Sequence, residues 1–207
     1  MSDHDDLESR FWGNCANTSG EETKQYVYLD EMGFQYKKVW HAGGIAYDGG
    51  GRSFVDIGGG PVSVLLKFEN RGPSMVIDPG QYPAWVRARY GKALIEVEQE
   101  PGEAYAKAEF NGQPFVFDVA LVYNCLQHTG DPARVIANAR ALARELRIFE
   151  WIGIPAHEGH PHELSAEKLE EWTGRKGAVK QFDGVNGCFG RAWILGPDGA
   201  VGAIGAR

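Results

Sequence analysis

Two acids flank a run of three glycines early in the chain, and this pattern could hold a ligand. Glycines 58–60 follow the short apolar segment 54–57, and they let the backbone turn sharply and approach a bound group closely. Asp56 lies inside that segment, and Asp78 follows the first of these glycines by 20 residues. Doubly wound folds place a carboxylate at that distance to accept hydrogen bonds from ribose hydroxyls. A tight turn without a ligand and a solvated acid are the plain alternatives, but together the two features predict a nucleoside-type ligand.

The residues around the glycine run bear on the charge of that ligand. A dinucleotide site should read GxGxxG, whereas Ser63 replaces the last glycine and Pro61 interrupts the pattern. Asp56 would repel a pyrophosphate, but it can serve an ammonium group directly or through water. These residues favour a cationic ligand that carries ribose over a nicotinamide dinucleotide.

A histidine in the second half of the chain is the candidate proton acceptor. His128 follows the long apolar run 115–123, and imidazole titrates in the range in which a general base is useful. A histidine that caps a helix or packs in the core is the alternative role for this side chain.

More histidines lie in the loop 157–162, which also holds a carboxylate. Such a set could bind a divalent metal. Gly159 and Pro161, however, leave no regular helix or strand face on which the ligands would converge, so we expect no metal site. We expect instead a loop that faces the substrate, with His162 or His160 as an alternative base.

Apolar segments alternate with helical patterns along the chain, which favours a parallel sheet with helices on both faces. Apolar runs rich in β-branched and aromatic residues predict strands, in chain order, at residues 54–57, 74–78, 93–97, 115–123, 147–152, 178–182 and 188–195. We expect a helix after each of the first five strands. Turn signals at 183–187 predict that the last two strands form an antiparallel hairpin.

Capping residues and periodic apolar positions predict where the helices lie. They are expected at 21–32 with Ser19 as the cap, from Pro61 to Phe68, at 82–90 with Trp85 on the inner face, at 103–108, at 132–143 with Asp131 as the cap, and after Ser165 as a further cap. The glycines at 43–44 and 49–51 are expected in loops.

Length and composition limit the class of protein. The 207 residues fit one domain, and a net charge of −7 with scattered basic residues disfavours nucleic acid and anionic membranes as partners. No apolar run approaches the length of a bilayer span, and residues 1–6 resemble neither a secretory signal nor a transit peptide. Three widely spaced cysteines without a CxxC pair predict reduced thiols, and we expect a cytoplasmic protein.

Four short motifs together resemble the Rossmann-like (class I) S-adenosylmethionine-dependent methyltransferases. They are residues 55–60 (VDIGGG), 77–78 (ID), 117–119 (FDV) and 124–132 (NCLQHTGDP), and the similarity extends from about residue 53 to 195. The resemblance implies an α/β fold with a seven-stranded Rossmann-like sheet. That sheet is mostly parallel with a C-terminal antiparallel hairpin and has helices on both faces. The chain departs from the family at 61–63, where many relatives have further small residues.

The resemblance also implies S-adenosylmethionine as the cofactor and a set of residues around it. These are Asp56, Gly58 and Gly60 at its amino-acid end, Asp78 and Pro79 at its ribose, Glu98 or Gln99 at its adenine, and Tyr123 and Asn124 at the end of the fourth strand. Methyl transfer needs positioning and, where the acceptor carries a proton, a base. The candidates for that base are His128 and His162.

We therefore expect residues 1–52 to form an N-terminal helical lid segment and residues 53–207 to form a compact S-adenosylmethionine-binding methyltransferase domain. The expected function is methyl transfer to a small molecule, because the chain has little room for a separate substrate domain. A non-catalytic protein that binds S-adenosylmethionine or S-adenosylhomocysteine is the alternative, and a nicotinamide oxidoreductase is a weaker one. The sequence leaves the acceptor, the methylated atom and the oligomeric state open.

Overall fold

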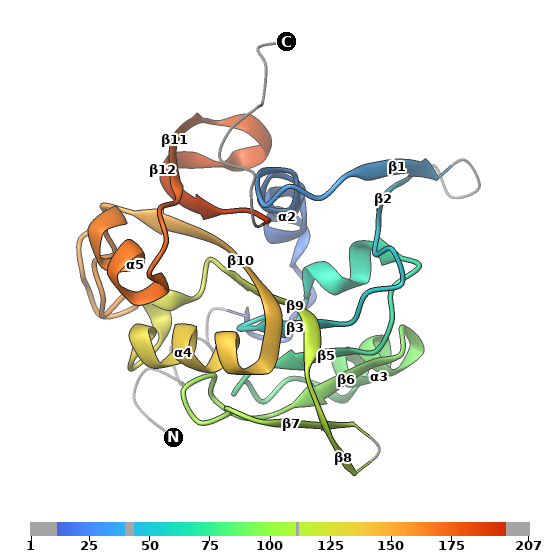
Figure 1. Ribbon diagram of the computed structural model, residues 1–207. Coiled ribbons are helices and arrows are strands. Elements are labelled where there is room, and N and C mark those ends of the chain that lie inside the picture. The colour runs from blue at the N-terminus through green and yellow to red at the C-terminus, as the bar shows by residue number, and fades with distance from the viewer. Residues whose placement is uncertain (1–11, 40–43, 111, 198–207) are drawn as a thin grey trace.

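A seven-stranded sheet forms the centre of the protein. The computed structural model describes residues 12–39, 44–110 and 112–197 (Figure 1). The strand order is β11-β12-β10-β9-β3-β5-β6. The strands are β3 (Phe54–Ile57), β5 (Ser74–Ile77), β6 (Ile95–Glu98), β9 (Phe117–Tyr123), β10 (Ala143–Ile152), β11 (Ala178–Asp183) and β12 (Phe189–Leu195).

The sheet has the predicted direction pattern. β10, β9, β3, β5 and β6 pair in parallel, whereas β12 runs antiparallel to both β10 and β11. From β3 the chain moves outward to β5 and β6 and then returns to β9 on the other side of β3. This reversal creates a crevice at the carboxyl ends of β3 and β9, where open α/β sheets bind ligands. The predicted fold class is confirmed.

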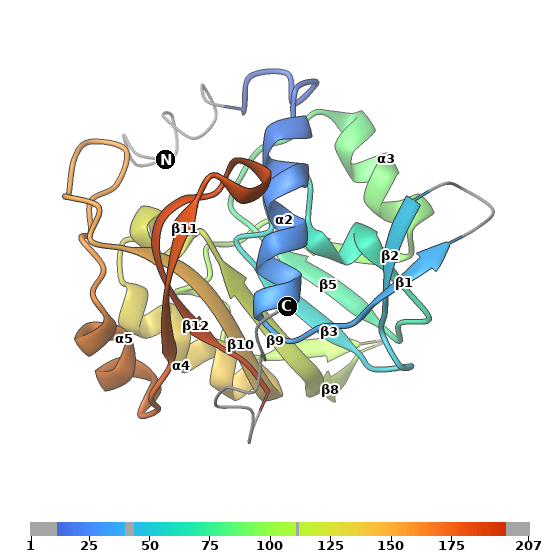
Figure 2. The ribbon, with the colours of Figure 1, turned by 90° about the horizontal axis from the view of Figure 1, so that it is seen from above.

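Helices cover both faces of the sheet because alternate residues of its central strands point to opposite sides. α2 (Ser19–Glu31) and α3 (Ala84–Lys92) pack with Phe54 and Leu121 on one face. α4 (Pro132–Leu142) and α5 (Ala166–Thr173) pack with Val55 and Ala120 on the other. All four strand residues are fully buried, as expected for a sheet covered on both sides. Figure 2 shows α2 lying over the sheet, between the β11–β12 hairpin and α3.

Two helix caps follow the sequence as predicted. The Asp131 carboxylate accepts a hydrogen bond from the Arg134 amide at 3.0 Å, and Pro132 begins α4. Ser165 Oγ accepts one from the Lys168 amide at 3.3 Å at the start of α5. The cap of α2 differs from the prediction. Thr18, not Ser19, is the N-cap residue, because the helix begins two residues earlier than expected.

The expected helix after Pro61 is wrong. The chain forms only a short 3₁₀ helix, η1 (Val64–Lys67), and Phe68 then enters the short strand β4 (Phe68–Glu69). The Tyr90 hydroxyl accepts a hydrogen bond from the Ser63 amide at 2.8 Å. Ser63 itself has extended backbone angles (φ −68°, ψ 147°), which interrupt any helix begun at Pro61 before its first turn is complete.

Other predicted elements are also corrected. Residues 103–108 form no helix, and a hairpin of β7 (Ala108–Phe110) and β8 (Gln113–Phe115) follows them. Gly44 begins β2 (Gly44–Asp48), which joins β1 (Tyr36–Val39) and β4 in a small second sheet, while Gly43 lies outside the described residues. Two of the five expected strand–helix units therefore lack an α-helix. Trp85 is 45% exposed rather than on the inner face of α3.

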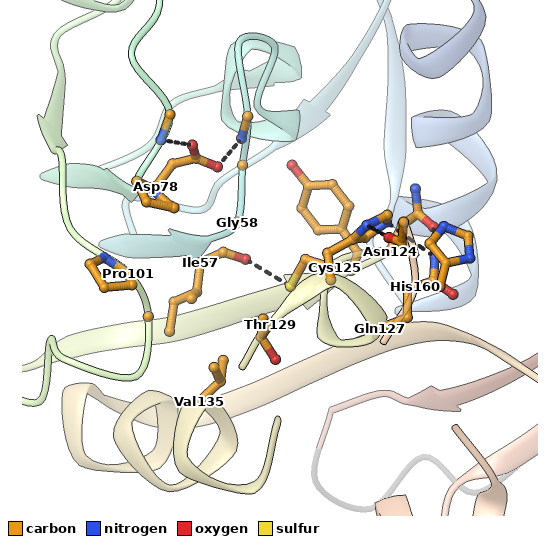
Figure 3. A pocket seen from close by; sticks show the side chains of 18 of the residues that line it. Ile57, Gly58, Asp78, Pro101, Asn124, Cys125, Gln127, Thr129, Val135 and His160 are labelled. Carbon is orange, nitrogen blue, oxygen red and sulfur yellow. Dashed lines mark hydrogen bonds between the residues drawn. The ribbon is translucent and has the colours of Figure 1, made fainter. Parts of the chain in front are cut away.

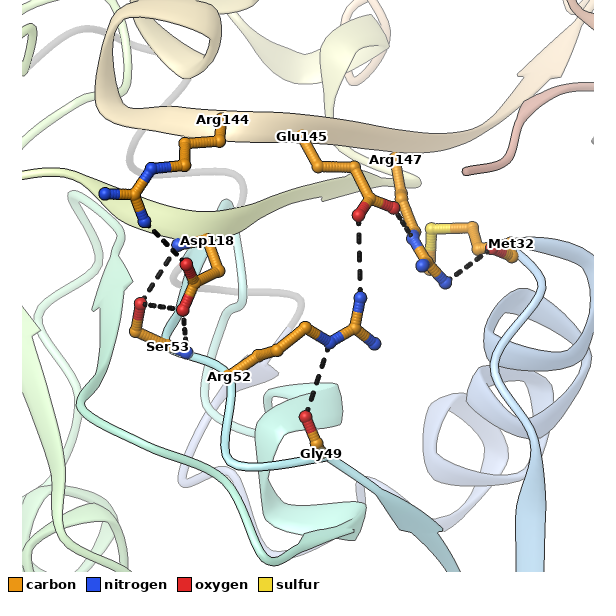
Figure 4. A network of polar contacts seen from close by, with 8 residues as sticks. All are labelled: Met32, Gly49, Arg52, Ser53, Asp118, Arg144, Glu145 and Arg147. Carbon is orange, nitrogen blue, oxygen red and sulfur yellow. Dashed lines mark hydrogen bonds and ion pairs between the residues drawn. The ribbon is translucent and has the colours of Figure 1, made fainter. Parts of the chain in front are cut away.

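A polar network at the amino ends of β3, β9 and β10 anchors α2 (Figure 4). The buried Arg147 donates a hydrogen bond from Nη1 to the carbonyl of Met32, just past the end of α2, at 3.0 Å. Its guanidinium lies 3.9 Å from the ring centroid of Phe34 and pairs with Glu145. α2 is thus part of the main core rather than a separate layer, while the predicted boundary at residue 52 stays a prediction.

Within the part of the chain that the structure describes, no helix combines the length and the apolar content that crossing a membrane requires.

Candidate active site

A cavity of about 1350 Å³ opens at the carboxyl ends of the central strands. Its wall is formed by the segments that follow β3, β5, β9 and β10, by the segment 101–104 after β6, and by α2 and the residue Trp12 before it. Figure 3 shows Asp78 and Pro101 at one end and Asn124, Gln127 and His160 at the other. The cavity therefore has two chemically different ends.

The glycine turn after β3 forms the floor between these ends. Gly58 and Gly60 have φ values of +76° and +61°, which residues other than glycine rarely adopt. A Cβ atom on Gly58 would lie 2.6 Å from Cys125 Cβ, so the turn rests directly on the segment that follows β9. Both glycines line the cavity. The backbone is accordingly open to close approach by a ligand, as the sequence predicts.

Asp78 joins the glycine turn to the segment after β5. Its Oδ2 accepts a hydrogen bond from the Gly60 amide at 2.9 Å, and its Oδ1 accepts one from the Gly80 amide at 2.8 Å. The Tyr82 hydroxyl donates a third bond to Oδ1 at 2.7 Å. Asp78 and Pro79 both line the cavity. The carboxylate thus shapes two segments of the wall.

Asp56 lies behind the glycine turn and not on the cavity wall. It is fully buried, and a Cβ on Gly59 would lie 2.7 Å from its Oδ2. That oxygen accepts hydrogen bonds from the hydroxyls of Ser63 and Tyr123, while Oδ1 has no partner among the described residues. Burial raises the pKa of Asp56 to about 7, against the opposing effect of the two hydroxyls. Its position makes Asp56 an anchor of the turn.

The segment 101–104 packs against Ile57 and Val135 and forms with them an apolar part of the cavity wall that the sequence did not predict. A Cβ on Gly102 would lie 2.6 Å from Ile57 Cγ2 and 3.5 Å from a methyl of Val135. The Asn138 side chain of α4 holds this segment by donating to the carbonyls of Gly102 and Glu103, both at 2.8 Å. In the sequence, the adjacent Pro101 and Gly102 are the only local indication that this segment packs closely against another.

The two residues that the sequence predicts to contact adenine lie outside this apolar part of the cavity wall. Glu98 ends β6 and is half-buried, and Gln99 is exposed. Neither belongs to the cavity wall, so their predicted contact with adenine stays a prediction.

The turn after β9 brings several polar side chains to the other end of the cavity. Tyr123, Asn124, Gln127 and His128 all line it. The turn is held by β10: the Asn124 amide donates to the Phe149 carbonyl at 2.9 Å. The amides of Cys125 and Leu126 donate to Glu150 Oε1 at 3.0 and 3.1 Å.

Glu150 is a fully buried carboxyl, and burial raises its pKa to about 7. Burial also raises the pKa of the Cys125 thiol well above its ordinary value, so this cysteine remains protonated and is not a candidate nucleophile. Glu150 serves the site by shaping the turn, since it does not line the cavity.

The structure separates the histidines that the sequence singled out. His128 lines the cavity together with His157 and His160, whereas the half-buried His162 does not. The rings of His128 and His160 meet edge to face with centroids 4.5 Å apart. Among the described residues, no group of three or more histidine, cysteine or acidic side chains is arranged to hold a metal ion.

The N-terminal region supplies one wall of the cavity, and Trp12 lies over the glycine turn, 3.8 Å from where a Cβ on Gly60 would lie. Trp12 precedes α2, and Glu21, Lys24 and Gln25 lie on its first two turns. The Gln25 side chain donates to the carbonyl of Val62, which ties α2 to the segment after the glycine turn.

Comparison with known proteins identifies the fold. No protein-family model and no curated protein sequence matches the chain. Among solved structures, it resembles the N-methyltransferase NodS of Bradyrhizobium japonicum bound to S-adenosyl-L-homocysteine. The TM-score is 0.57 at 13% identity, over 93% of this chain and 96% of that one.

Two further solved structures of methyltransferases have a similar fold. Phosphoethanolamine N-methyltransferase 2 of Haemonchus contortus gives a TM-score of 0.57 at 16% identity, over 88% of this chain and 47% of that one. An S-adenosylmethionine-dependent methyltransferase of Aquifex aeolicus gives 0.53 at 16% identity, over 94% and 99%. The chain therefore has the fold of the class I S-adenosylmethionine-dependent methyltransferases.

Proposed function

We propose that this protein is an S-adenosylmethionine-dependent methyltransferase that acts on a small-molecule acceptor. The observation that carries the proposal is that one cavity holds both the glycine turn joined to Asp78 and the imidazole of His128. The first feature suits a ribose-bearing ligand, and the second suits removal of a proton from an acceptor. Two proteins of the same fold, NodS and the H. contortus enzyme, bind S-adenosylhomocysteine.

The residues present fit that cofactor. The backbone of Gly58 to Gly60 lines the cavity and would border its amino-acid end, and Asp78 with Pro79 would border its ribose. The apolar part of the wall formed by residues 101–104, Ile57 and Val135 would border the adenine, since ligand pockets are lined mostly by apolar groups. Asp56 would act on the amino-acid end only through the turn that it anchors.

The cavity has room for an acceptor beside the cofactor. Its volume of about 1350 Å³ exceeds the roughly 300–1,000 Å³ of an ordinary single-ligand site. The acceptor would lie at the histidine end, between α2, the loop 154–161 and the turn before β12. The N-terminal region would cover the cavity, with Trp12 over the glycine turn and α2 beside the acceptor, which is the lid role expected for residues 1–52.

Chemically, the bound cofactor supplies a methyl group on a positively charged sulfur. The protein holds the acceptor in line with it, excludes water and removes a proton where the acceptor carries one. We assign this removal of a proton to His128. Its position in the cavity wall favours an enzyme over a protein that only binds the cofactor.

Calorimetry tests the proposal. The wild-type protein should bind S-adenosylmethionine and S-adenosylhomocysteine but not NAD. Asp78→Ala should weaken binding by roughly 10- to 100-fold, as expected for loss of charge-assisted hydrogen bonds. Glu69→Ala, which removes an exposed carboxylate of β4, is the matched control and should bind normally. Binding of NAD with no response to the other two ligands would refute the proposal.

A second experiment separates catalysis from binding. Transfer of a labelled methyl group to a panel of small amines, phenols and N-heterocycles should identify acceptors. His128→Asn should retain cofactor affinity while transfer falls by roughly 10²-fold or more. Equal transfer by this variant and the wild type would remove His128 from the mechanism.

A further inference from the structure

The loop after β10 contains a closed turn that lies against His128. The His157 amide donates to the His160 carbonyl, and the His160 amide donates back to the His157 carbonyl, both at 2.9 Å. The Gly159 amide donates to His157 Nδ1 at 3.1 Å. These bonds fix the backbone of the turn, and with it the direction of the Gly159 carbonyl.

That carbonyl determines which nitrogen of His128 carries the proton. His128 Nδ1 lies 2.9 Å from the Gly159 oxygen. A carbonyl oxygen can only accept a hydrogen bond, so Nδ1 must be the protonated nitrogen. In the neutral ring the other nitrogen, Nε2, then has the lone pair.

The neighbouring amide agrees with this assignment. Gln127 Nε2 donates to Asn124 Oδ1 at 3.2 Å. The same nitrogen lies 3.4 Å from His128 Nε2 and can donate only to an unprotonated nitrogen. This contact is compatible with the tautomer that the Gly159 carbonyl requires.

The turn also limits rotation of the His128 ring. The ring of His160 packs edge to face against it, and the ring of His157 lies 4.3 Å from His160 between centroids. Turning the His128 ring over about its Cβ–Cγ bond would put Cδ2 in the place of Nδ1 and Cε1 in the place of Nε2, so it would break the bond to the Gly159 carbonyl.

We propose that the turn 157–160 is a positioning element that selects Nε2 of His128 as the proton-accepting nitrogen. This inference rests on the proposed function for the identity of the reaction, but the tautomer itself does not. It implies an acceptor whose attacking atom carries a proton, as in a hydroxyl or an N–H group.

In the proton transfer, the acceptor's X–H group takes the place of the Gln127 amide at Nε2. Its X–H bond breaks, the proton moves to Nε2, and the electron pair left on X forms the new bond to a methyl carbon. A bound methyl donor would supply that methyl group, and its sulfur would keep the electron pair of the carbon–sulfur bond. The Gly159 carbonyl stabilises the resulting imidazolium through Nδ1–H, and the proton then passes to solvent.

Nuclear magnetic resonance tests the tautomer without any knowledge of the acceptor. In the full-length protein labelled with ¹⁵N-histidine, at a pH above the titration of imidazole, His128 should show protonated Nδ1 and unprotonated Nε2. The His128→Gln variant assigns the signals. A protonated Nε2, or the tautomer mixture of an unstructured peptide, would overturn the proposal.

Variants test whether the turn is the cause. Deletion of Glu158 and Gly159 should return His128 to a tautomer mixture and leave calorimetric affinity for S-adenosylhomocysteine within about twofold. His162→Ala, outside the cavity wall, should change neither property. Gln127→Met should keep Nδ1 of His128 protonated, because the turn 157–160 is intact. This variant replaces the deletion as the test if the deletion prevents folding. A tautomer change in Gln127→Met but not in the deletion would assign the selection to Gln127 and refute the role of the turn.

The two proposals fail separately. Absence of cofactor binding by the wild type would refute the methyltransferase function while the tautomer is unaffected. The wrong tautomer with normal cofactor binding would refute only the positioning role.

Discussion

The Tyr123 hydroxyl donates a 2.7 Å hydrogen bond to Asp56 Oδ2, joining the end of β9 to the strand that precedes the glycine turn. The same hydroxyl accepts a bond from the Val64 amide at 3.1 Å. Because Ser63 also donates to Asp56, the buried carboxyl connects three segments under the cavity. The sequence predicts that Asp56 lies beside the ligand. In the structure, Asp56 instead supports the glycine turn, and the turn would contact the ligand.

Removing that hydroxyl should weaken both the fold and the site. Tyr123→Phe leaves Asp56 with one donor and the Val64 amide with none, so the free energy of unfolding should fall by about 1–3 kcal/mol. Urea denaturation measures this change. Tyr36→Phe removes an exposed hydroxyl and should change stability by less than about 0.5 kcal/mol. Equal stability of the two variants would show that the buried contact contributes nothing.

The buried acids should make stability depend on pH. The pKa values of Asp56 and Glu150 are raised to about 7 in the folded protein. Between about pH 4 and pH 7 the folded state therefore binds protons that the unfolded state has released. Their contribution to the free energy of unfolding is greatest at the acid end and falls as pH rises to 7, by up to a few kcal/mol.

Differences between variants isolate this effect, because Glu22 and Asp118 have lowered pKa values and act in the opposite direction. Asp56→Asn and Glu150→Gln should each lose less stability than the wild type between pH 4.5 and pH 7, a range set by the folded and unfolded pKa values (about 7 and roughly 4). Urea denaturation at several pH values measures the slopes. Parallel slopes for wild type and variants would contradict the raised pKa values.

Alanine variants of two glycines with similar backbone angles distinguish backbone strain from loss of close packing. Gly58 and Gly50 have φ values of +76° and +61°, but only Gly58 has a neighbour, Cys125, where a Cβ would lie. Gly50→Ala should cost about 1–2 kcal/mol from strain alone. Gly58→Ala should cost clearly more and reduce cofactor affinity as the turn moves. Thermal unfolding and calorimetry measure both, and equal effects of the two variants would argue against close packing at Gly58.

Two arginines at the opposite edge of the sheet should differ in importance (Figure 4). The Arg147 side chain is 5% exposed and holds the end of α2, whereas the Arg144 side chain is 70% exposed and pairs with Asp118 at 2.7 Å. Arg147→Ala should cost roughly 3 kcal/mol or more, because it removes the buried contacts with the Met32 carbonyl and the Phe34 ring and leaves Glu145 paired only with Arg52. Arg144→Ala should cost less than about 1 kcal/mol. Similar losses in urea denaturation would mean that burial does not distinguish the two pairs.

Local sequence was sufficient for the seven strands of the main sheet and for two of the caps. Buried strands such as 54–57 and 74–77 are short apolar runs ended by glycine or proline, and Asp131 and Ser165 cap helices through contacts only three residues away. The placement of Asp78 after the glycines also follows from spacing along the chain. These features depend on interactions between near neighbours, so the order of residues is enough to predict them.

Tertiary structure decided the features that join distant segments. The segment after Pro61 is not an α-helix: Ser63 is extended, and its amide binds the hydroxyl of Tyr90, 27 residues later. The apolar part of the cavity wall forms only where residues 101–104 meet Ile57 and Val135. His128 receives its tautomer from Gly159, 31 residues later. Hydrogen bonds and burial between such segments exist only once the sheet has assembled, so residue order alone could name the candidate base but not its proton-accepting nitrogen.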